Sequence, residues 1–270
     1  MKNKGMAVPY VVWMAIFVIS PLILVVIYAF TSASGGFTLE NFTAMGEYVS
    51  VFSRSFLLAV VATLICILLG YPLAYFLARE GAGMRRIATM LIMLPMWMNF
   101  LLRTYALMTI LENTGLLNKF LALLGLPQLN IINTPGAVVI GMVYNYLPFM
   151  VLPIYSVIVK LDRSLIEAAQ DLGASPDRCF TRVVFPLSLP GILSGITMVF
   201  VPAVSTFVIS QLLGGGKSMM LGDLIEMEFL GTSYNPHLGS AIALVMMIVV
   251  VICMRLMNKF GSGEEQAVIL

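Results

Sequence analysis

Few residues in this sequence could carry chemistry, and none of the spacings expected for catalysis or metal binding is complete. Cys66, Cys179 and Cys253 lie far apart, so they form neither a metal-binding spacing nor a disulfide framework. His237 is the single histidine, and no residue near it in the sequence suggests a metal site or a proton relay. We therefore expect no catalytic residue, no metal site and no cofactor bound by this chain.

One glycine-rich stretch invites comparison with a phosphate-binding loop. Gly216, Lys217 and Ser218 match the end of that motif, but Gln211 stands where its first glycine is required. The stretch also follows an apolar segment, and we expect it to lie outside the cell, where ATP is not supplied. We interpret it as a flexible loop. If ATP is hydrolysed, we expect another chain to do it.

The segment from Lys160 to Pro190 carries the most informative pattern. Ser164 and Glu167 fit a capping box, which predicts that a helix starts there. An apolar stripe follows at helical spacing, with Glu167 and Asp171 on the polar side, and Gly173 is placed to end the helix in a left-handed conformation. The members of the stripe are Leu165, Ala168, Ala169 and Leu172.

A second short helix is predicted directly afterwards. Ser175 suits its N-cap and Pro176 its first position, and Phe180 falls within it. We expect Pro186 and Pro190 to end this helix and turn the chain back. Such a short, stiff helix pair suits docking in a groove on another protein. A simple hairpin linking two apolar segments is the alternative that the residues alone leave open.

The elements that must position this pair are set by composition. Of 270 residues, 60% are hydrophobic and only 10% are charged, and the mean hydropathy is +0.99. These values exclude an ordinary soluble domain, which carries about 25% charged residues. The net charge of +2, without a basic cluster, excludes a nucleic-acid partner. The chain is predicted to be an all-α membrane protein in a lipid bilayer.

Uncharged runs divide the chain into six expected transmembrane helices within a single domain. The first run could also be a secretory signal, but its apolar part of about 25 residues is longer than the 7–15 of a signal core. A loop over 160–189 contains the helix pair. The expected spans are about 6–30, 55–78, 87–111, 136–159, 190–213 and 238–257.

The distribution of lysine and arginine predicts the orientation. With the N-terminus in the cytoplasm, eleven of these residues lie inside and three outside. The loop 160–189 and both termini are then cytoplasmic. Arg103 falls within a span, about 25 Å along a helix from Arg86, where it could snorkel to the outer interface as a structural anchor or act at the outer mouth of the pathway.

The pattern of the cytoplasmic loop resembles the EAA loop of ABC importer permeases. Glu167, Ala168 and Ala169 are followed by Gly173 and, nine residues later, by a stretch that ends with Pro186. The resemblance implies the type I ABC importer permease fold, in the inner membrane of a bacterium, and a loop that couples to an ATPase. The coupling residues that it implies are Ser164, Glu167, Ala168, Ala169, Asp171, Gly173, Ala174, Pro176, Phe180 and Pro186.

Three further stretches resemble permeases of spermidine/putrescine importers: 96–105, 147–155 and 213–223. The resemblance implies an ATPase dimer that binds ATP and Mg, a second related permease, a periplasmic substrate-binding protein and alternating access. Such a cargo needs hydrogen-bond acceptors and aromatic faces. The candidates for the pathway are Trp97, Asn99, Tyr105, Tyr144, Asn145, Tyr146, Ser205, Thr206, Ser210, Gln211, Asp223 and Glu226.

Alternatives remain for several of these assignments. The stretch from Met219 to Leu230 could be an interfacial helix with an acidic edge at the entrance, or the solvated face of a surface helix. The cargo could be another small solute. An ion-coupled secondary transporter is a further possibility, although no expected span contains an Asp or Glu for coupling to protons or sodium.

Overall fold

The computed structural model describes residues 8–231 and 234–265, and this part of the chain is helical. Its only β-pairing is an isolated bridge between Thr31 and Phe37. The α-helices are α1 (Val8–Met14), α2 (Ser20–Ala29), α3 (Glu40–Ala44), α4 (Val49–Arg79), α5 (Ala82–Trp97), α6 (Phe100–Leu111), α7 (Leu116–Leu123), α8 (Pro135–Ile158), α9 (Arg163–Asp171), α10 (Pro176–Cys179), α11 (Phe185–Ser205), α12 (Val208–Gly214), α13 (Leu221–Leu230) and α14 (Pro236–Glu265). Shorter π-helical turns occupy Ala15–Ile19 and Phe180–Val184, and a 3-10 turn occupies Met45–Tyr48.

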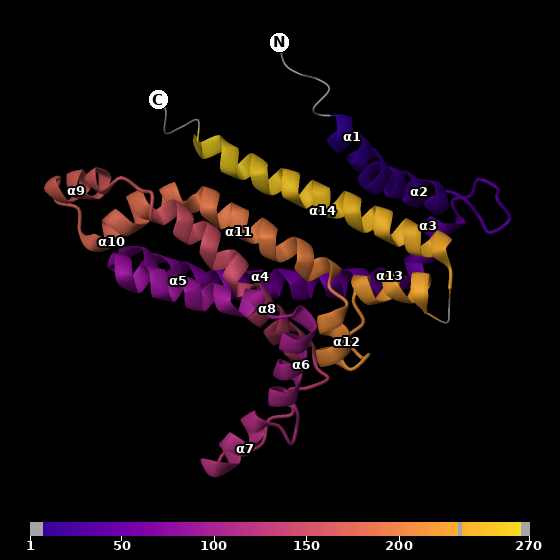
Figure 1. Cartoon of the computed structure of the whole chain (residues 1–270), viewed down its shortest axis with the longest axis horizontal. Coiled ribbons are helices and arrows are strands. Elements are labelled where there is room, and N and C mark those ends of the chain that lie inside the picture. Colours follow the sequence, from indigo (N-terminus) through magenta and orange to yellow (C-terminus); the bar gives the residue numbers. More distant parts are fainter. Residues whose placement is uncertain (1–7, 232–233, 266–270) are drawn as a thin grey trace.

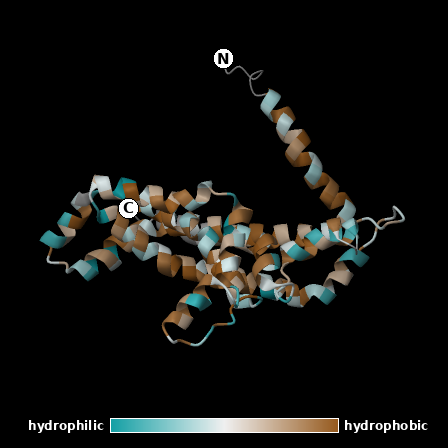
Figure 2. Ribbon diagram, turned by 60° about the horizontal axis from the view of Figure 1, so that its bottom comes forward, coloured by the Kyte–Doolittle hydropathy of each residue, from teal (hydrophilic) through white to brown (hydrophobic). Residues whose placement is uncertain are grey.

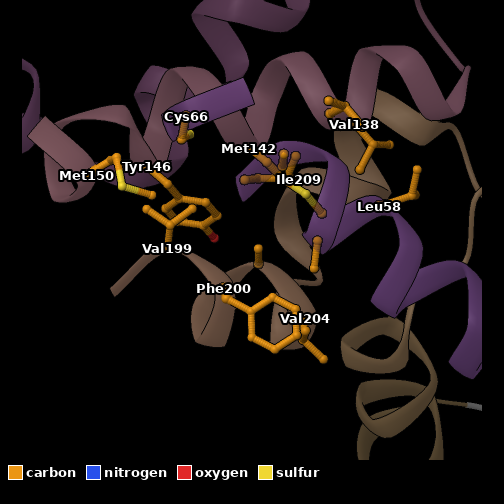
Figure 3. Packing of buried hydrophobic residues seen from close by; sticks show 14 of the residues in the cluster. Leu58, Cys66, Val138, Met142, Tyr146, Met150, Val199, Phe200, Val204 and Ile209 are labelled. Atoms are coloured by element: carbon orange, nitrogen blue, oxygen red, sulfur yellow. The ribbon is translucent and has the colours of Figure 1, made fainter. Parts of the chain in front are cut away.

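The core is formed where α4, α8 and α11 pack together along their length (Figure 1). Figure 3 shows Met142, Tyr146 and Met150 of α8 among side chains from α4, α11 and α12. Gly191 and Gly195 of α11 lie where a side chain would collide with α8. Small residues at such positions let helix backbones approach closely, as is usual in membrane proteins.

Several hydroxyl groups inside these helices are satisfied by the backbone of the same helix. The Ser55 hydroxyl donates to the Val51 carbonyl at 2.8 Å, and the Thr63 hydroxyl donates to the Ala59 carbonyl at 2.7 Å. Because lipid offers no hydrogen-bond partner, such bonds allow hydroxyl groups within an apolar helix. The uncharged stretch after Arg54 can therefore run as one helix to Arg79.

The outer helices are α14, which packs on α2 and α13, and the N-terminal helical stretch Val8–Ala29, which ends with α2. Figure 2 shows the N-terminal part of this stretch projecting away from the bundle. The stretch Val8–Ala29 is apolar, and none of its most hydrophobic window is buried. Hydrophobic residues dominate the middle of the bundle, and hydrophilic ones gather toward its ends (Figure 2). Such a surface suits a surrounding bilayer.

Five helices of the described part are long and apolar enough to span a membrane, and a bent pair makes a sixth. The bent pair is α5 with α6–α7, which meet at 96°. The expected span over 87–111 is not one continuous helix, because the chain leaves helical geometry at Met98 and Asn99. The break follows Pro95, whose ring removes a backbone donor.

The fifth expected span, 190–213, also differs from the structure. One continuous helical stretch runs from Pro176 to Ser205, and the chain then breaks before α12. Pro186 and Pro190 do not stop the helix as expected. Pro186 falls in the first turn of α11, directly after a π-helical turn that already alters the backbone bonding there.

Two expectations concern residues outside the described part. Residues 6 and 7 of the first expected span lie there, and so do Lys2 and Lys4, which contribute to the charge asymmetry. The first described helix begins at Val8.

Candidate functional site

The helix pair α9–α10 forms one end of the molecule, where it connects α8 to α11 (Figure 1). Asp162 is the N-cap of α9, and its carboxylate accepts a hydrogen bond from the Ser164 amide at 3.0 Å, which lowers the pKa of Asp162. The expected capping box of Ser164 with Glu167 is therefore wrong. A carboxylate at the positive end of a helix is an effective cap, so the helix begins at Arg163.

The expected end of α9 at Gly173 is confirmed, and its geometry is that of a Schellman motif. Gly173 has φ +80°, and its amide donates to the Gln170 carbonyl at 2.8 Å. The Ala174 amide donates to the Ala169 carbonyl at 3.0 Å. These two bonds satisfy carbonyls that the helix end would leave free, and they fix the sharp turn into α10.

The inner side of the helix pair is anchored by aromatic rings. Phe180, which follows α10, packs edge-on against Tyr71 and Tyr75 of α4, with ring centroids 5.8 and 5.1 Å apart. The Tyr71 hydroxyl lies 3.0 Å from the Ser188 hydroxyl of α11. Edge-to-face contacts between aromatic rings both stabilise the packing and favour a particular orientation of the rings. The base of the helix pair is therefore held against both α4 and α11.

A pocket of about 560 Å³ lies between the helix pair and the ends of α4, α5 and α8. Arg79 and Arg85 line it together with Glu167 of α9. The Arg79 guanidinium lies 4.8 Å from the centre of the Tyr75 ring, which fixes its direction.

The outer side of α9 is bare. Leu172 is 90% exposed and Leu165 is 47% exposed, and both belong to the apolar stripe that the sequence predicts. Glu167 and Asp171, on the polar side of the helix, are exposed as well, and Glu167 lines the pocket described above. Ile166 instead turns toward the core. Leu165 and Leu172 thus point away from the rest of the described chain, which leaves an apolar surface available to another protein.

The other implied coupling residues lie in the helix pair or directly next to it, with Phe180 in the π-helical turn and Pro186 in the first turn of α11. Ser164, Ala168, Pro176 and Pro186 are exposed, whereas Ala169, Ala174 and Phe180 are partly buried.

The bend between α5 and α6 forms a second polar centre. Asn99 is the N-cap of α6, and its side-chain oxygen accepts from the Leu101 amide at 2.9 Å. Arg103 is only 5% exposed, and its guanidinium donates to the Pro95 carbonyl at 2.8 Å. The expectation that Arg103 snorkels to an interface is therefore wrong. It assumed one unbroken helix from Arg86 to Arg103, and that helix is broken.

Aromatic and polar groups of α8 surround Arg103. Its guanidinium carbon lies 5.9 Å from the centre of the Tyr144 ring. Asn145 is fully buried and donates to the Gly141 carbonyl at 2.8 Å. Tyr146 reaches toward the Pro202 carbonyl of α11 at 3.5 Å, and it points among the core residues in Figure 3. Of the pathway candidates, Tyr144, Asn145 and Tyr146 thus lie together, whereas Trp97 and Tyr105 are exposed at 77% and 48%.

The break between α11 and α12 leads to the remaining candidates. Ser205 is exposed and Thr206 is buried. Ser210 is 1% exposed, and its hydroxyl donates to the Phe207 carbonyl at 2.9 Å. Gln211 is exposed and donates from its side-chain amide to the Glu226 carboxylate of α13. Non-helical backbone within an otherwise helical membrane protein is typical of a lined pathway.

The helix α13 is more buried than either sequence interpretation anticipated. Asp223 is 5% exposed, and one carboxylate oxygen accepts from the Met220 amide at 2.7 Å. Burial, and to a smaller extent the nearby Glu226, raise the pKa of Asp223 to about 6. Glu228 is 4% exposed, and burial raises its pKa too. The helix is therefore neither a surface helix with a solvated acidic face nor a purely interfacial one.

Sequence reasoning missed the anchoring residues Tyr71, Tyr75 and Ser188. Tyr71 and Tyr75 are four residues apart and near the end of an apolar run, which was a usable signal for one aromatic face. Ser188 gave no signal in the sequence, because its partner lies 117 residues away.

Comparison with known proteins adds independent information. Residues 66–260 match the family described as "Binding-protein-dependent transport system inner membrane component". The chain is 39% identical over 271 residues to the spermidine/putrescine transport system permease protein PotB of Escherichia coli K12, covering 94% of this chain and 98% of that protein. It is 40% identical over 242 residues to the protein of the same name from Haemophilus influenzae, covering 86% of this chain and 84% of that protein.

A solved structure supports the fold. A chain of a bacterial ABC transporter involved in the import of the acidic polysaccharide alginate superimposes with a TM-score of 0.82 at 17% identity, covering 96% of this chain and 94% of that chain. At this low identity the likeness concerns the fold alone, and that fold is the type I ABC importer permease fold expected from the sequence.

Proposed function

We propose that this chain, which belongs to the family of binding-protein-dependent transport system inner membrane components, is the permease subunit of an ATP-driven importer of polyamines. The family and the apolar helices make it a multi-pass protein of the inner membrane. The relatives described above are named as spermidine/putrescine permeases and match most of the chain, which supports this cargo. The chain forms one half of an alternating-access pathway and catalyses no bond chemistry itself.

The observation that carries the proposal is that one side of the α9–α10 pair packs against this chain while the other side is exposed. Phe180 fixes its inner side to α4, while on the outer side Leu165 is 47% exposed and Leu172 is 90% exposed within the described part of the chain. A rigid element with one bound and one bare face is suited to receive a push from another protein. We assign that push to an ATPase dimer, which binds ATP and Mg and hydrolyses the ATP.

The movement would reach the pathway through the helices that join the pair directly. The chain runs from α8 directly into α9 and from α10 directly into α11, so a displacement of the helix pair moves both α8 and α11. Two breaks adjoin these helices, one at 98–99 between α5 and α6, which both contact α8, and one at 206–207 at the end of α11. Breaks of this kind occur in transporters where a cavity alternates between two openings. The pathway candidates are Trp97, Asn99, Tyr105, Tyr144, Tyr146, Ser205 and Ser210, with Asp223 and Glu226 nearer the entrance.

The remaining parts of the proposal concern topology and further partners. The α9–α10 pair and both termini lie in the cytoplasm, as the excess of lysine and arginine on that side supports. The opposite end, with α12 and α13, then faces the periplasm and receives a substrate-binding protein. A second, related permease completes the pathway.

The test is uptake of labelled spermidine and putrescine into vesicles that contain this chain with its ATPase, its second permease and its binding protein. We expect uptake only when ATP and Mg are supplied to the ATPase. Uptake driven by a proton or sodium gradient without ATP would contradict the proposal. Competition by unlabelled solutes identifies the cargo class, and a solute other than a polyamine that competes best would overturn that part alone.

A further inference from the structure

The α12–α13 end of the molecule contains an incompletely satisfied carboxylate. The Asp223 side chain is only 5% exposed, and its Oδ1 atom is buried without a hydrogen-bond partner. Its other oxygen, Oδ2, accepts from the Met220 amide. Buried polar atoms are nearly always paired, so an unpaired carboxylate oxygen points to a missing donor.

Two further groups that can accept hydrogen bonds lie beside this carboxylate. The Ser210 hydroxyl is close enough to the Asp223 carboxyl to lower its pKa, and it also donates to the Phe207 carbonyl at 2.9 Å; its oxygen retains lone pairs that can accept a hydrogen bond. Glu226 is one helical turn after Asp223, is partly buried, and is close enough for its charge to act on Asp223. The three groups form a cluster that has acceptors in excess of donors.

The exposed neighbour Gln211 indicates what kind of donor fits. Its side-chain amide donates an N–H group to the Glu226 carboxylate at the outer edge of the cluster. A nitrogen donor already occupies the position that an ammonium nitrogen would take. Because Gln211 is exposed and neutral, a cation can replace it at this carboxylate without losing a buried contact.

We propose that Asp223, Glu226 and Ser210 form a binding site for a primary ammonium group of the cargo. An ammonium group has three N–H donors and no acceptor, which matches a cluster of two carboxylates and one hydroxyl oxygen in which acceptors outnumber donors. The inference rests on the proposed polyamine cargo and names the groups that recognise it. It also supplies the acidic residues that the spans themselves lack.

A metal ion is the less suitable occupant. Within the described residues no group of three His, Cys, Asp or Glu side chains could hold one. Glu228, the third acidic residue of α13, does not join the cluster, because its Cβ faces Gly239 of α14. It therefore provides a matched control with the same charge on the same helix.

The experiment uses the complete importer in vesicles and labelled spermidine at a concentration below half-saturation. We expect Asp223→Asn and Glu226→Gln each to lower the initial uptake by about tenfold, the factor that about 1.4 kcal/mol represents. The control Glu228→Gln should stay within about twofold of the wild type. ATPase stimulation by the loaded binding protein, which should persist in all three variants, reports on folding and assembly.

The outcomes separate this site from the proposed function. If the wild type imports spermidine with ATP and both variants do so equally well, the site is refuted while the function stands. If the wild type imports no polyamine, the function itself fails. Should Asp223→Asn not assemble, Glu226→Gln decides, because its side chain lies at the outer edge of the cluster and is only partly buried. An equal loss in Glu228→Gln would also refute the site, since it would reveal a general effect of charge on α13.

Discussion

Substitution of Gly173 tests whether the turn between α9 and α10 must hold its present backbone. Gly173 has φ +80°, and a Cβ added there would meet nothing within 4 Å. The cost of a side chain is therefore conformational and not steric. For L-residues other than Asn and Asp, the left-handed region costs about 1–2 kcal/mol. This cost falls on the Schellman turn, which fixes the orientation of α9 and its outer surface.

The expected order of activity is unusual and therefore informative. Gly173→Asn should retain most ATP-driven uptake, because Asn tolerates left-handed geometry. Gly173→Ala should lower uptake by about fivefold, and Gly173→Val by up to about 30-fold, because 1–2 kcal/mol changes a two-state ratio by these factors. The measurement is initial spermidine uptake in vesicles, together with copurification of the ATPase with the tagged permease.

Alanine is thus predicted to lower uptake more than asparagine, although the alanine side chain is smaller. If Gly173 instead mattered because a partner packs against it, Ala would be tolerated better than Asn. That result would refute the backbone explanation and move the requirement to the interface. Equal activity of all variants would contradict any role for the turn.

Three further predictions concern single contacts. Tyr71→Phe should lower the free energy of unfolding by about 1 kcal/mol, as thermal unfolding in detergent would measure, because it removes the bond to Ser188; no change would mean that the bond contributes nothing. Arg103→Gln should destabilise by about 1.5–3 kcal/mol in the same assay, since a charged donor to the Pro95 carbonyl is lost; an unchanged midpoint would refute a stabilising role at the bend. Because the folded pKa of Asp223 is raised from 3.8 to about 6, the folded chain retains this proton to a higher pH, so the carboxyl favours folding at low pH and that contribution is lost as the pH rises from 3.8 to about 6. Cargo binding needs the ionised form, so uptake relative to Asp223→Asn should rise from pH 5 to pH 7, and a constant ratio would contradict this.

Local signals explain what the sequence could predict. The helices follow from uncharged runs, and the end of α9 follows from Gly173, because each depends on residues within one or two turns. The prediction placed the N-cap of α9 two positions too late, at Ser164 instead of Asp162, because the local sequence offers two suitable caps. Asp162 and Ser164 are both good caps, and the charged one prevails at the helix N-terminus.

The broken helices show where local signals are insufficient. Proline in a span predicts a kink, yet α8 runs through Pro148 and Pro153 without interruption. By contrast, α5 ends shortly after Pro95. At Pro95, unlike at Pro148 and Pro153, the chain turns by 96° and the Pro95 carbonyl then receives the guanidinium of Arg103, which lies on the next helix.

The burial of Asp223 also could not be read from its own neighbourhood. Its helix mixes acidic and apolar residues, which fits a surface helix, an interfacial helix or a packed one. The outcome is decided by α12, which returns from the break after Ser205 and brings Ser210 and Gln211 against α13. A contact of this kind depends on where the preceding helix stops, which the sequence placed eight residues too late.

The continuity of α11 joins the two ends of the molecule mechanically. The helical stretch from Pro176 to Ser205 has 30 residues and is therefore about 45 Å long. Its first turns belong to the coupling pair beside Phe180, and its last residue adjoins the break that leads to Ser210. Had Pro186 ended the helix, a push on α10 would dissipate in a flexible joint. Since the stretch is unbroken, a tilt at one end must displace the other, and the ammonium site proposed at α12–α13 lies where that displacement arrives.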